Sequence, residues 1–502
     1  MAPQEKQLLM FLTGAGGSGK SEVINSVLAY VQGFCKELSY PFDKRTIVLT
    51  ALTGVAATSI NGETIDKAAH LFDDKIGSAA IEEWKNARLV IIDEISFATE
   101  SKLILLHEKL GLLKERVRAK YGGLHIVFTG DFSQLEPVMG DPLYYNPNFV
   151  QWHEWINCFV ELTGQHRFKD DPEFGRVMKR LREGNPTDAD IAYLNTRVIN
   201  GTHQNSPTDK DLPAGIAYAV YANRDRTAIN NGLFAEHIKQ THSTDKNVAP
   251  PMHTLVIRSD DLKWQTSKKP FGLSAKHTLW SECGDSHVKT MDGRTEKFVD
   301  TCLKLHSNIP LMYTENDDVA NGKANGTLCY LMKVQMLDDV TESDFSLMNF
   351  DGYWVRAIDA SKVDYLLCKH AHSEETFEVR AVNSKCKIDM PIELIPGEKQ
   401  RKIVRAKVNR FPVLVNNATT GHKLQGQTKK SVFVSVWHYG KNWPYVVLSR
   451  VRTLSGLFLR TELDLKYDFS LDGRLKKMLY RMRHKMPQDV PEFSEIHAEM
   501  SI

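Results

Sequence analysis

The sequence lacks the features that would place the chain in a membrane, outside the cell or in a disulfide-bonded scaffold. No apolar run approaches the roughly 20 residues of a membrane-spanning helix, and the polar first seven residues do not have the form of a signal peptide. The seven cysteines are scattered and form no Cys-x-x-Cys pair, which argues against a zinc ribbon and a disulfide framework. We therefore expect an intracellular protein with reduced thiols, in the nucleus or mitochondrion of a eukaryote and otherwise in the cytoplasm.

The sequence also lacks an excess of charge of either sign. Lysine and arginine number 64 and aspartate and glutamate 62, so the formal net charge is +2. A protein that binds nucleic acid needs only a local basic groove, so this balance does not exclude nucleic-acid binding. A chain of 502 residues without repeats or low-complexity tracts is long enough for roughly two to four domains.

Short apolar strands alternate with helical stretches through the first 160 residues. Alternation of this kind predicts an α/β fold in which helical crossovers join parallel strands. The expected elements are strands at 8–13, 46–52, 89–92 and 125–129 and helices at 21–40 and 101–120.

The rest of the chain predicts a second α/β domain that is interrupted by insertions. Strands at 217–222 and 431–437 resemble those of the first domain, whereas the β-rich runs at 328–335, 353–358 and 376–382 predict a small barrel or sandwich. The predicted division is a first α/β domain at 1–160 with a small insertion near 65–85, a second at 161–245 and 411–465, an insertion of unclear fold at 246–300, a β-rich insertion at 301–410 and a tail at 466–502.

Within the tail, residues 474–485 form a basic amphipathic pattern. The pattern predicts a surface helix with a solvated charged face. Contact of this helix with DNA or with a partner is the alternative.

Residues 14–21 read Gly-Ala-Gly-Gly-Ser-Gly-Lys-Ser and fit the phosphate-loop pattern in full. They lie between an expected strand and an expected helix, as the motif requires. Glycines let backbone N–H groups turn toward phosphate oxygens, Lys20 is expected to meet the β- and γ-phosphates, and the Ser21 hydroxyl is expected to bind Mg²⁺. The loop alone predicts a nucleotide-binding protein and no more. The expected nucleotide contacts are Gly14, Gly16, Gly17, Ser18, Gly19, Lys20 and Ser21.

The strand at 89–92 ends in two carboxylates, Asp93 and Glu94, which places them at the carboxyl edge of the sheet beside the phosphate loop. Asp93 is expected to hold Mg²⁺, directly or through water, and Glu94 to polarise the attacking water. An acidic pair by itself can be a solvated turn. Together with the phosphate loop it predicts ATP hydrolysis.

Three further side chains are candidates to complete this site. Gln134 follows the strand at 125–129 and can hydrogen-bond both a γ-phosphate and a water, which is typical of motors that sense the phosphate. Arg167 and Arg450 are candidates, from the second α/β domain, to neutralise charge on the transferred phosphoryl group. Their spacing alone leaves both open to being ordinary surface arginines.

Two polar, glycine-bearing loops, at 50–57 and 419–428, have the composition to touch a phosphodiester backbone without reading bases. With the segments above, they resemble in order the motifs of a superfamily 1 helicase of the 5′-to-3′ branch, most closely the petite-integration-frequency (PIF) type. The resemblance spans roughly residues 8–465. It rests on the phosphate loop, Thr53-Gly54-Val55-Ala56-Ala57, Tyr121-Gly122-Gly123, Asp93-Glu94, Gly130-Asp131-Phe132-Ser133-Gln134-Leu135, the two arginine segments and His422-Lys423-Leu424-Gln425-Gly426.

The resemblance implies two RecA-like P-loop NTPase domains with parallel sheets, plus a small β-rich, SH3-like barrel insertion. It implies ATP and Mg²⁺ as cofactors, single-stranded and forked duplex DNA as partners, and movement from 5′ to 3′. We expect a monomer that contacts no membrane. The implied roles are catalysis for Lys20, Glu94, Gln134, Arg167 and Arg450; Mg²⁺ binding for Ser21 and Asp93; an approach to the phosphates for Gly426; and DNA contact for Thr53, Gly54, His422, Lys423 and Gln425.

Two positions depart from the family pattern. Asp66 stands where a histidine is usual and is expected to weaken contact with a negatively charged strand, and Glu136 replaces a customary proline. For the glutamine that contacts adenine in the family, Gln4 and Gln7 are the candidates.

Three hypotheses follow: a strand-separating DNA helicase, a single-strand translocase that remodels protein–DNA complexes or acts on RNA, and a catalytically idle nucleotide-dependent interaction module. Intact Lys20, Glu94 and Gln134 argue against the third. The sequence leaves open whether such a motor serves replication, repair, recombination, telomeres or a mobile element.

Overall fold

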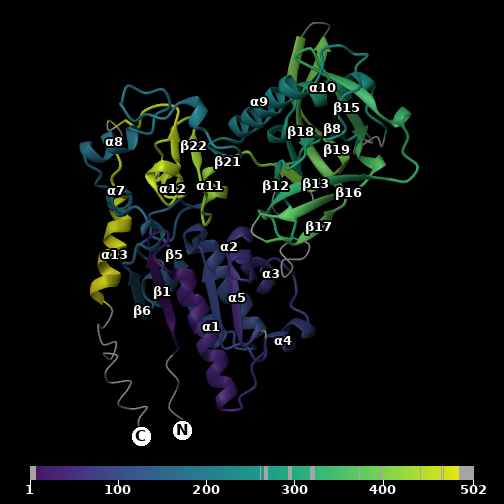
Figure 1. Ribbon diagram of the computed structural model, residues 1–502. Coiled ribbons are helices and arrows are strands. Elements are labelled where there is room, and N and C mark those ends of the chain that lie inside the picture. The colour runs from purple at the N-terminus through teal and green to yellow at the C-terminus, as the bar shows by residue number, and fades with distance from the viewer. Residues whose placement is uncertain are drawn as a thin grey trace. The chain divides into compact units, whose positions relative to one another are not determined.

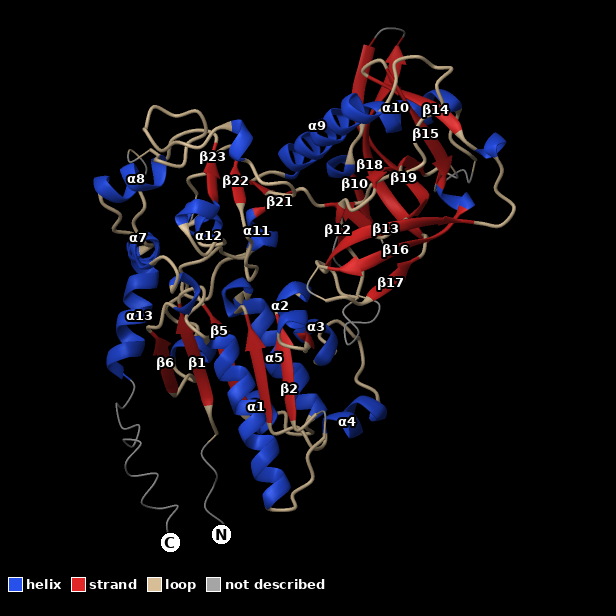
Figure 2. Cartoon of the chain, in the orientation of Figure 1, coloured by secondary structure: helices blue, strands red, loops and turns tan. Residues whose placement is uncertain are grey.

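The computed structural model describes residues 7–485 except 44, 261, 265–268, 292–296, 317–322, 372, 396–397, 441, 465 and 467. The chain forms two compact units, whose elements are drawn in Figure 1 and Figure 2. Unit 1 comprises Met1–Tyr193, Tyr439–Thr453 and Asp464–Ile502, and unit 2 comprises Leu194–His438 and Leu454–Leu463. The finer domain boundaries that we derived from the sequence remain a prediction.

Unit 1 is built on a six-stranded sheet in the order β3-β2-β4-β5-β1-β6, in which every pairing is parallel. Its strands are β1 (Leu9–Gly14), β2 (Ile47–Ala51), β3 (Glu63–Thr64), β4 (Leu89–Asp93), β5 (His125–Gly130) and β6 (Cys158–Leu162). Its helices are α1 (Lys20–Glu37), α2 (Gly54–Ser59), α3 (Ile65–Ala68), α4 (Ser78–Trp84), α5 (Glu100–Leu113), α6 (Val150–His153), α7 (Pro172–Glu183), α12 (Trp443–Leu448) and α13 (Gly473–Lys485), while α8 (Asp188–Asn195) spans the boundary of the units.

The core of unit 1 explains why these strands read as apolar runs. Central strands of a parallel sheet are covered on both faces, so alternation with polar residues is lost. In β4, residues 90–93 are all buried. On the same core, Phe11, Phe128 and Phe132 meet Trp152 edge-on, with ring centroids 5.1–5.5 Å apart.

Helix α13 is the amphipathic stretch that the sequence predicted in the tail. Its apolar residues Leu475, Met478 and Met482 are buried in the core of unit 1, and the indole N–H of Trp152 donates to the Met478 sulfur at 3.1 Å. On its polar side, Arg483 pairs with Glu161 in β6 at 2.7 Å. Residues 474–485 therefore form a packed surface helix, whose contact with DNA or a partner stays untested.

Unit 2 contains a second parallel sheet, in the order β21-β7-β22-β23. The other three sheets are mainly antiparallel and form the β-rich part of unit 2. Their strand orders are β11-β8-β15-β14, β10-β18-β19-β9 and β17-β16-β13-β12-β20. Strands from residues 246–300, for which the sequence predicted no fold, pair in these sheets with strands from residues 301–410. An α/β chain with two parallel sheets and a β-rich insertion confirms the predicted fold class.

The elements of unit 2 have the following bounds. Its helices are α9 (Asn223–Thr241), α10 (Leu273–Glu282) and α11 (Gly421–Leu424). Its strands are β7 (Ala217–Val220), β8 (Thr254–Arg258), β9 (Lys263–Trp264), β10 (Val288–Thr290), β11 (Cys302–His306), β12 (Pro310–Tyr313), β13 (Leu328–Met336), β14 (Ser346–Phe350), β15 (Tyr353–Asp359), β16 (Val363–His370), β17 (Thr376–Val379), β18 (Val382–Ile395), β19 (Glu398–Arg410), β20 (Val413–Val415), β21 (Ala418–Thr420), β22 (Val432–Val434) and β23 (Leu457–Leu459).

Two general features of the described residues bear on the sequence predictions. No helix among them combines the length and the apolar character that crossing a bilayer requires. All seven cysteines are free thiols, and Cys283, Cys302, Cys329, Cys368 and Cys386 are buried.

The packing of α13 generates a stability prediction. Leu475→Ala should lower the free energy of unfolding by about 2–5 kcal/mol, because it leaves a cavity in the core that α13 completes. Lys477→Ala, at an exposed position of the same helix, is the control and should change it by less than about 0.5 kcal/mol. Urea unfolding curves measure both. Equal midpoints for the two variants would show that α13 does not belong to the cooperative core.

Candidate nucleotide-binding site

The phosphate loop connects β1 to α1 and requires glycine at particular positions. Gly17 and Gly19 have φ angles of 84° and 102°, which other residues adopt only with strain. A Cβ atom on Gly17 would lie 2.3 Å from the Cβ of Arg167, so this position also excludes a side chain by contact. The Lys20 ammonium donates to the carbonyl oxygens of Gly14 and Ala15, at 2.7 and 3.2 Å, and thus lies along the loop.

The two carboxylates at the end of β4 differ in their surroundings. Oδ1 of Asp93 accepts hydrogen bonds from the Glu94 backbone N–H and the Thr129 hydroxyl, both at 2.9 Å. Burial raises the pKa of Asp93 above its ordinary value, against the opposing charge of Lys20. Glu94 is buried in the left-handed region at φ 57° and ψ 42°, a conformation that costs a non-glycine residue about 1–2 kcal/mol. Such strain concentrates at functional positions.

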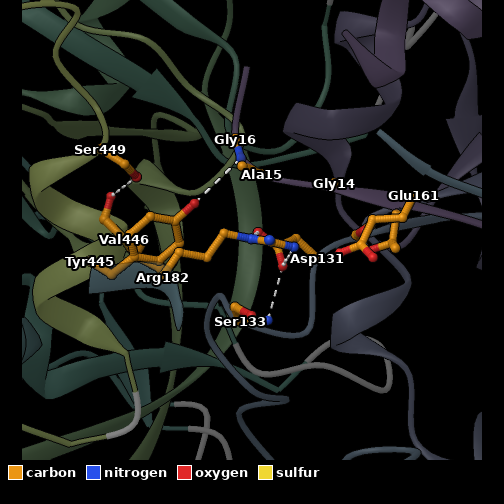
Figure 3. A network of polar contacts seen from close by, with 12 residues as sticks. Gly14, Ala15, Gly16, Asp131, Ser133, Glu161, Arg182, Tyr445, Val446 and Ser449 are labelled. Carbon is orange, nitrogen blue, oxygen red and sulfur yellow. Dashed lines mark hydrogen bonds and ion pairs between the residues drawn. The ribbon is translucent and has the colours of Figure 1, made fainter. Parts of the chain in front are cut away.

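Asp131, at the end of β5, forms a buried ion pair with Arg182 of α7, which the sequence analysis missed. Two guanidinium nitrogens of Arg182 lie 3.0 and 3.1 Å from the two carboxylate oxygens, and Figure 3 shows the side chain extending toward Asp131. Burial alone would raise the pKa of Asp131, but the Arg182 charge and its hydrogen bonds hold it below its ordinary value. The pair fixes α7 against the strand end that carries Gln134.

Arg167 and Arg450 both lie against the phosphate loop within unit 1. A Cβ atom on Gly16 would lie 3.0 Å from Nη1 of Arg167 and 3.3 Å from Nη2 of Arg450. Arg167 donates to the Ser449 carbonyl at 2.9 Å, and Arg450 donates to the Ser449 hydroxyl at 2.7 Å. The structure thus brings together the two arginines that the sequence singled out.

Tyr445 of α12 closes the same side of the loop, and the sequence analysis gave it no role. Its hydroxyl accepts from the Gly16 backbone N–H at 3.4 Å, as Figure 3 shows. Burial raises the pKa of Tyr445, so the phenol stays neutral. The segment that carries Arg450 is therefore held at the phosphate loop by a second contact.

The electrostatic balance of this site suits an anion. Burial lowers the pKa of Arg450, and the neighbouring Arg167 lowers it further. Burial also lowers the pKa of Arg167, and that of Lys20 even though three carboxylates surround Lys20. Each of these cations has lost water, so a phosphate group placed among them would restore the interactions that burial removes.

Two buried polar atoms of the predicted site residues have no hydrogen-bond partner among the described residues. They are the Ser18 hydroxyl oxygen in the phosphate loop and Oε1 of Gln134. A buried polar atom left unsatisfied costs about 1–3 kcal/mol. A phosphate oxygen would accept from the Ser18 hydroxyl, and a bound water would donate to Oε1 of Gln134. Gln134 itself is 3% exposed.

The two residues predicted to bind Mg²⁺ offer oxygen ligands. Among the described residues, no group of three or more His, Cys, Asp or Glu side chains could hold a metal ion by itself. Ser21 and Asp93 supply a hydroxyl and a carboxylate, the oxygen ligands that Mg²⁺ prefers, and Mg²⁺ in such sites takes its remaining ligands from phosphates and water.

The residues for which the sequence predicted DNA contact belong to both units. In unit 1, the Thr53 hydroxyl caps helix α2 by accepting from the Ala56 N–H at 3.2 Å, which fixes Gly54 in the first turn. In unit 2, Lys423 donates to Oδ1 of Asn325 at 3.2 Å, and burial lowers the pKa of Lys423 to about 8. His422 and Gln425 belong to the same loop, in which Gly426 has a φ of 79°. Their predicted roles, and that of Gly426 at the phosphates, stay predictions.

The positions that depart from the family pattern have local partners. Asp66 pairs with Lys102 of α5 at 2.7 Å, so the negative charge that we expected to weaken DNA contact is offset within unit 1. Glu136 accepts from the Tyr144 hydroxyl at 2.8 Å. Gln7 donates to the carbonyl oxygens of Lys120 and Leu124, at 2.7 and 2.6 Å, and thereby fastens the Tyr-Gly-Gly turn. Gln4 lies outside the described residues.

The fold and the site together define a P-loop nucleotide-binding protein with two arginines at the phosphate loop. Residues 1–185 match the family model described as PIF1-like helicase. This match agrees with the resemblance to PIF-type helicases that the motifs had indicated.

Individual proteins extend the similarity beyond the family model. The chain is 30% identical over 495 residues to the ATP-dependent DNA helicase PIF1 of Candida albicans, covering 89% of this chain and 52% of that protein. It is 29% identical over 493 residues to the ATP-dependent DNA helicase Pif1 of a Psychrobacter species, covering 91% of this chain and 67% of that protein. The chain thus spans about half to two thirds of the length of these two relatives.

A solved structure supports the fold. The crystal structure of Bacteroides Pif1 bound to single-stranded DNA superposes with a TM-score of 0.60 at 19% sequence identity, covering 96% of this chain and 94% of that chain. The fold of the chain is therefore similar to that of Bacteroides Pif1.

The Asp131–Arg182 pair generates a prediction for unit 1. Arg182→Ala should lower the free energy of unfolding by about 3–5 kcal/mol at neutral pH, because it leaves the Asp131 carboxylate buried without its partner. Adding Asp131→Asn should recover part of the loss, since no charge then remains buried. Guanidinium unfolding measures both variants, and a double variant that is no more stable than Arg182→Ala would contradict the pairing.

The same pair predicts a dependence of stability on acid. The folded pKa of Asp131 lies below its unfolded value, so its contribution is present at neutral pH and is lost as the pH falls below about 4. Unfolding curves of the wild type and of the double variant between pH 7 and pH 3 should therefore converge as the pH falls. A constant difference over this range would contradict the assignment.

Proposed function

We propose that this protein is an ATP-dependent DNA helicase that translocates on single-stranded DNA from 5′ to 3′ and unwinds duplex DNA. The observation that carries the proposal is the approach of Arg167 and Arg450 to Gly16 of the phosphate loop, in a site that already holds Lys20. Simple nucleotide binding needs the loop alone. Guanidinium groups at the γ-phosphate side make the site sensitive to whether the terminal phosphate is attached.

In the proposed reaction, Lys20 and the loop N–H groups hold the β- and γ-phosphates of ATP. Glu94 accepts a proton from the attacking water, and Oε1 of Gln134 orients that water. Arg167 and Arg450 stabilise the charge on the transferred phosphoryl group. When bound by Ser21 and Asp93, Mg²⁺ would neutralise charge on the phosphate oxygens.

Hydrolysis can be coupled to movement through the chain itself. Arg450 and Tyr445 belong to the segment Tyr439–Thr453, which follows β22 and precedes β23 in the sequence. Loss of the γ-phosphate removes the anion that holds Arg450 at the loop. The segment is then free to shift, and the strands that flank it in the chain receive the displacement.

Single-stranded DNA is the proposed track, and forked duplex DNA the proposed substrate. The related helicases are named for ATP-dependent action on DNA, and the Bacteroides structure holds a single strand. In this chain, the candidate contacts are Thr53 and Gly54 after β2 and the His422–Gln425 loop after β21. A translocase that remodels protein–DNA complexes with little unwinding is the alternative.

The chemical step generates the next prediction. Lys20→Ala should lower ATP turnover by roughly 100-fold or more, since it removes the cation at the transferred phosphate. Glu94→Gln should lower turnover by roughly 10²- to 10⁴-fold while ATP still binds, because only proton transfer is lost. Phosphate release with and without single-stranded DNA measures both. Lys36→Ala, at an exposed position of α1, is the control and should behave as the wild type.

Duplex unwinding separates the proposal from its alternatives. Duplexes with a 5′ tail, a 3′ tail or no tail are mixed with the protein and ATP, and strand release is followed by fluorescence. We expect release only with the 5′ tail. Release only with a 3′ tail would reverse the polarity, and DNA-stimulated turnover without release would favour the remodelling translocase. ATP turnover that is absent, or unchanged by DNA, would contradict both motor functions.

A further inference from the structure

The carboxyl ends of three strands in unit 2 converge on one edge of the parallel sheet. Thr420 of β21 pairs with Val220 of β7, and Val434 of β22 pairs with Ala219 of β7. The residues that follow these strands therefore leave the sheet side by side. The strands β21 and β22 and the helix α11 that follows β21 are labelled in Figure 2. Ligands of open α/β sheets bind at such an edge.

Two aromatic rings from different strand ends stack at this edge. Tyr221 comes directly after β7, and His438 follows β22. Their ring centroids are 3.3 Å apart and their planes differ by 15°. Burial lowers the pKa of His438, so the imidazole is neutral at neutral pH and stacks without adding a charge.

Much of the Tyr221 side chain stays exposed in the stacked pair. Tyr221 is 48% exposed although one face of its ring rests on His438. A tyrosine that served only to cover the sheet edge would be expected to bury most of its surface, because burial of apolar area is what stabilises such a contact. The remaining surface of Tyr221 is therefore available for a flat ligand.

The neighbouring strand end carries the loop for which the sequence predicted contact with a DNA backbone. His422 belongs to helix α11 directly after β21; burial lowers its pKa, and the charge of His438 lowers it further. Lys423 is the next residue. A backbone held at this loop would bring its bases to the same edge as Tyr221.

We infer that the Tyr221–His438 pair is a stacking platform for one base of the translocating DNA strand. The inference rests on the proposed helicase function and deepens it by assigning a base contact to a motor that otherwise grips the phosphodiester backbone. Stacking on an aromatic face tolerates every base, so the contact suits a motor that must move through any sequence.

Binding of a labelled oligo-dT tests the platform by fluorescence anisotropy. Tyr221→Leu keeps the apolar volume but removes the ring and should weaken binding by roughly 5- to 100-fold, the range that loss of one base–aromatic stack gives. The slope of affinity against salt concentration should not change, because stacking neutralises no phosphate. Tyr30→Leu is the matched control, since Tyr30 of α1 also stacks on an aromatic ring, that of Phe34, and is 65% exposed; it should bind as the wild type.

An oligonucleotide of the same length with abasic positions distinguishes the loss of a base contact from a general disturbance of folding by Tyr221→Leu. Tyr221→Trp enlarges the ring and should bind normal DNA at least as tightly as the wild type, but should show no gain on the abasic strand. The losses from Tyr221→Leu and from abasic DNA should be strongly non-additive, because both remove the same contact.

Each result of these binding measurements either supports or refutes the stacking platform. If the wild type binds oligo-dT and Tyr221→Leu binds equally well, or if the Tyr30 control loses as much affinity, the platform is refuted while the helicase proposal stands. Fully additive losses with abasic DNA refute it as well. If the wild type does not bind single-stranded DNA at all, the proposed function fails and the platform fails with it.

Discussion

The nucleotide site depends on positive charge that has been taken out of water. Lys20, Arg167 and Arg450 are brought to the phosphate loop by β1, the segment before α7 and the segment after α12, and burial lowers the pKa of each. Such an arrangement is unfavourable by itself. It becomes favourable when an anion enters, and more so when that anion carries one more phosphate.

This constraint accounts for several local features at once. The loop must approach the arginines closely, which requires Gly16 and Gly17. The Asp131 carboxylate is engaged elsewhere, since it is paired with Arg182. Lys20, by contrast, lies among Asp93, Glu94 and Asp131. The site therefore separates a cationic side, formed by the two arginines, from an acidic side suited to a metal ion and a water.

The sequence predicted the elements that carry strong local signals. The strands β1, β2, β4 and β5 are buried apolar runs at motif positions, and the expected helix at 21–40 corresponds to α1. Residues 246–300 show no periodicity because their strands are short and pair with distant partners. The long hairpin of β18 and β19 was also missed, although lysine and arginine alternate with its apolar residues in the pattern of a half-buried strand.

The site residues were predictable where they belong to motifs of consecutive residues. The phosphate loop, Asp93, Glu94 and Gln134 each follow a strand, so a parallel sheet alone predicts that they converge at its carboxyl edge. Arg182 pairs with Asp131 across 51 positions of the sequence, and Tyr445 reaches Gly16 across 429. No local pattern encodes such contacts, because the fold and not the spacing brings them together.

Nucleotide affinity tests the central claim most directly. Binding of ADP and of a non-hydrolysable ATP analogue is measured for the wild type, Arg450→Ala and Arg167→Ala. If buried arginine charge is stabilised by the γ-phosphate, the wild type prefers the ATP analogue, and each variant loses that preference while its affinity for ADP changes little. Variants that keep the full preference of the wild type would contradict the account.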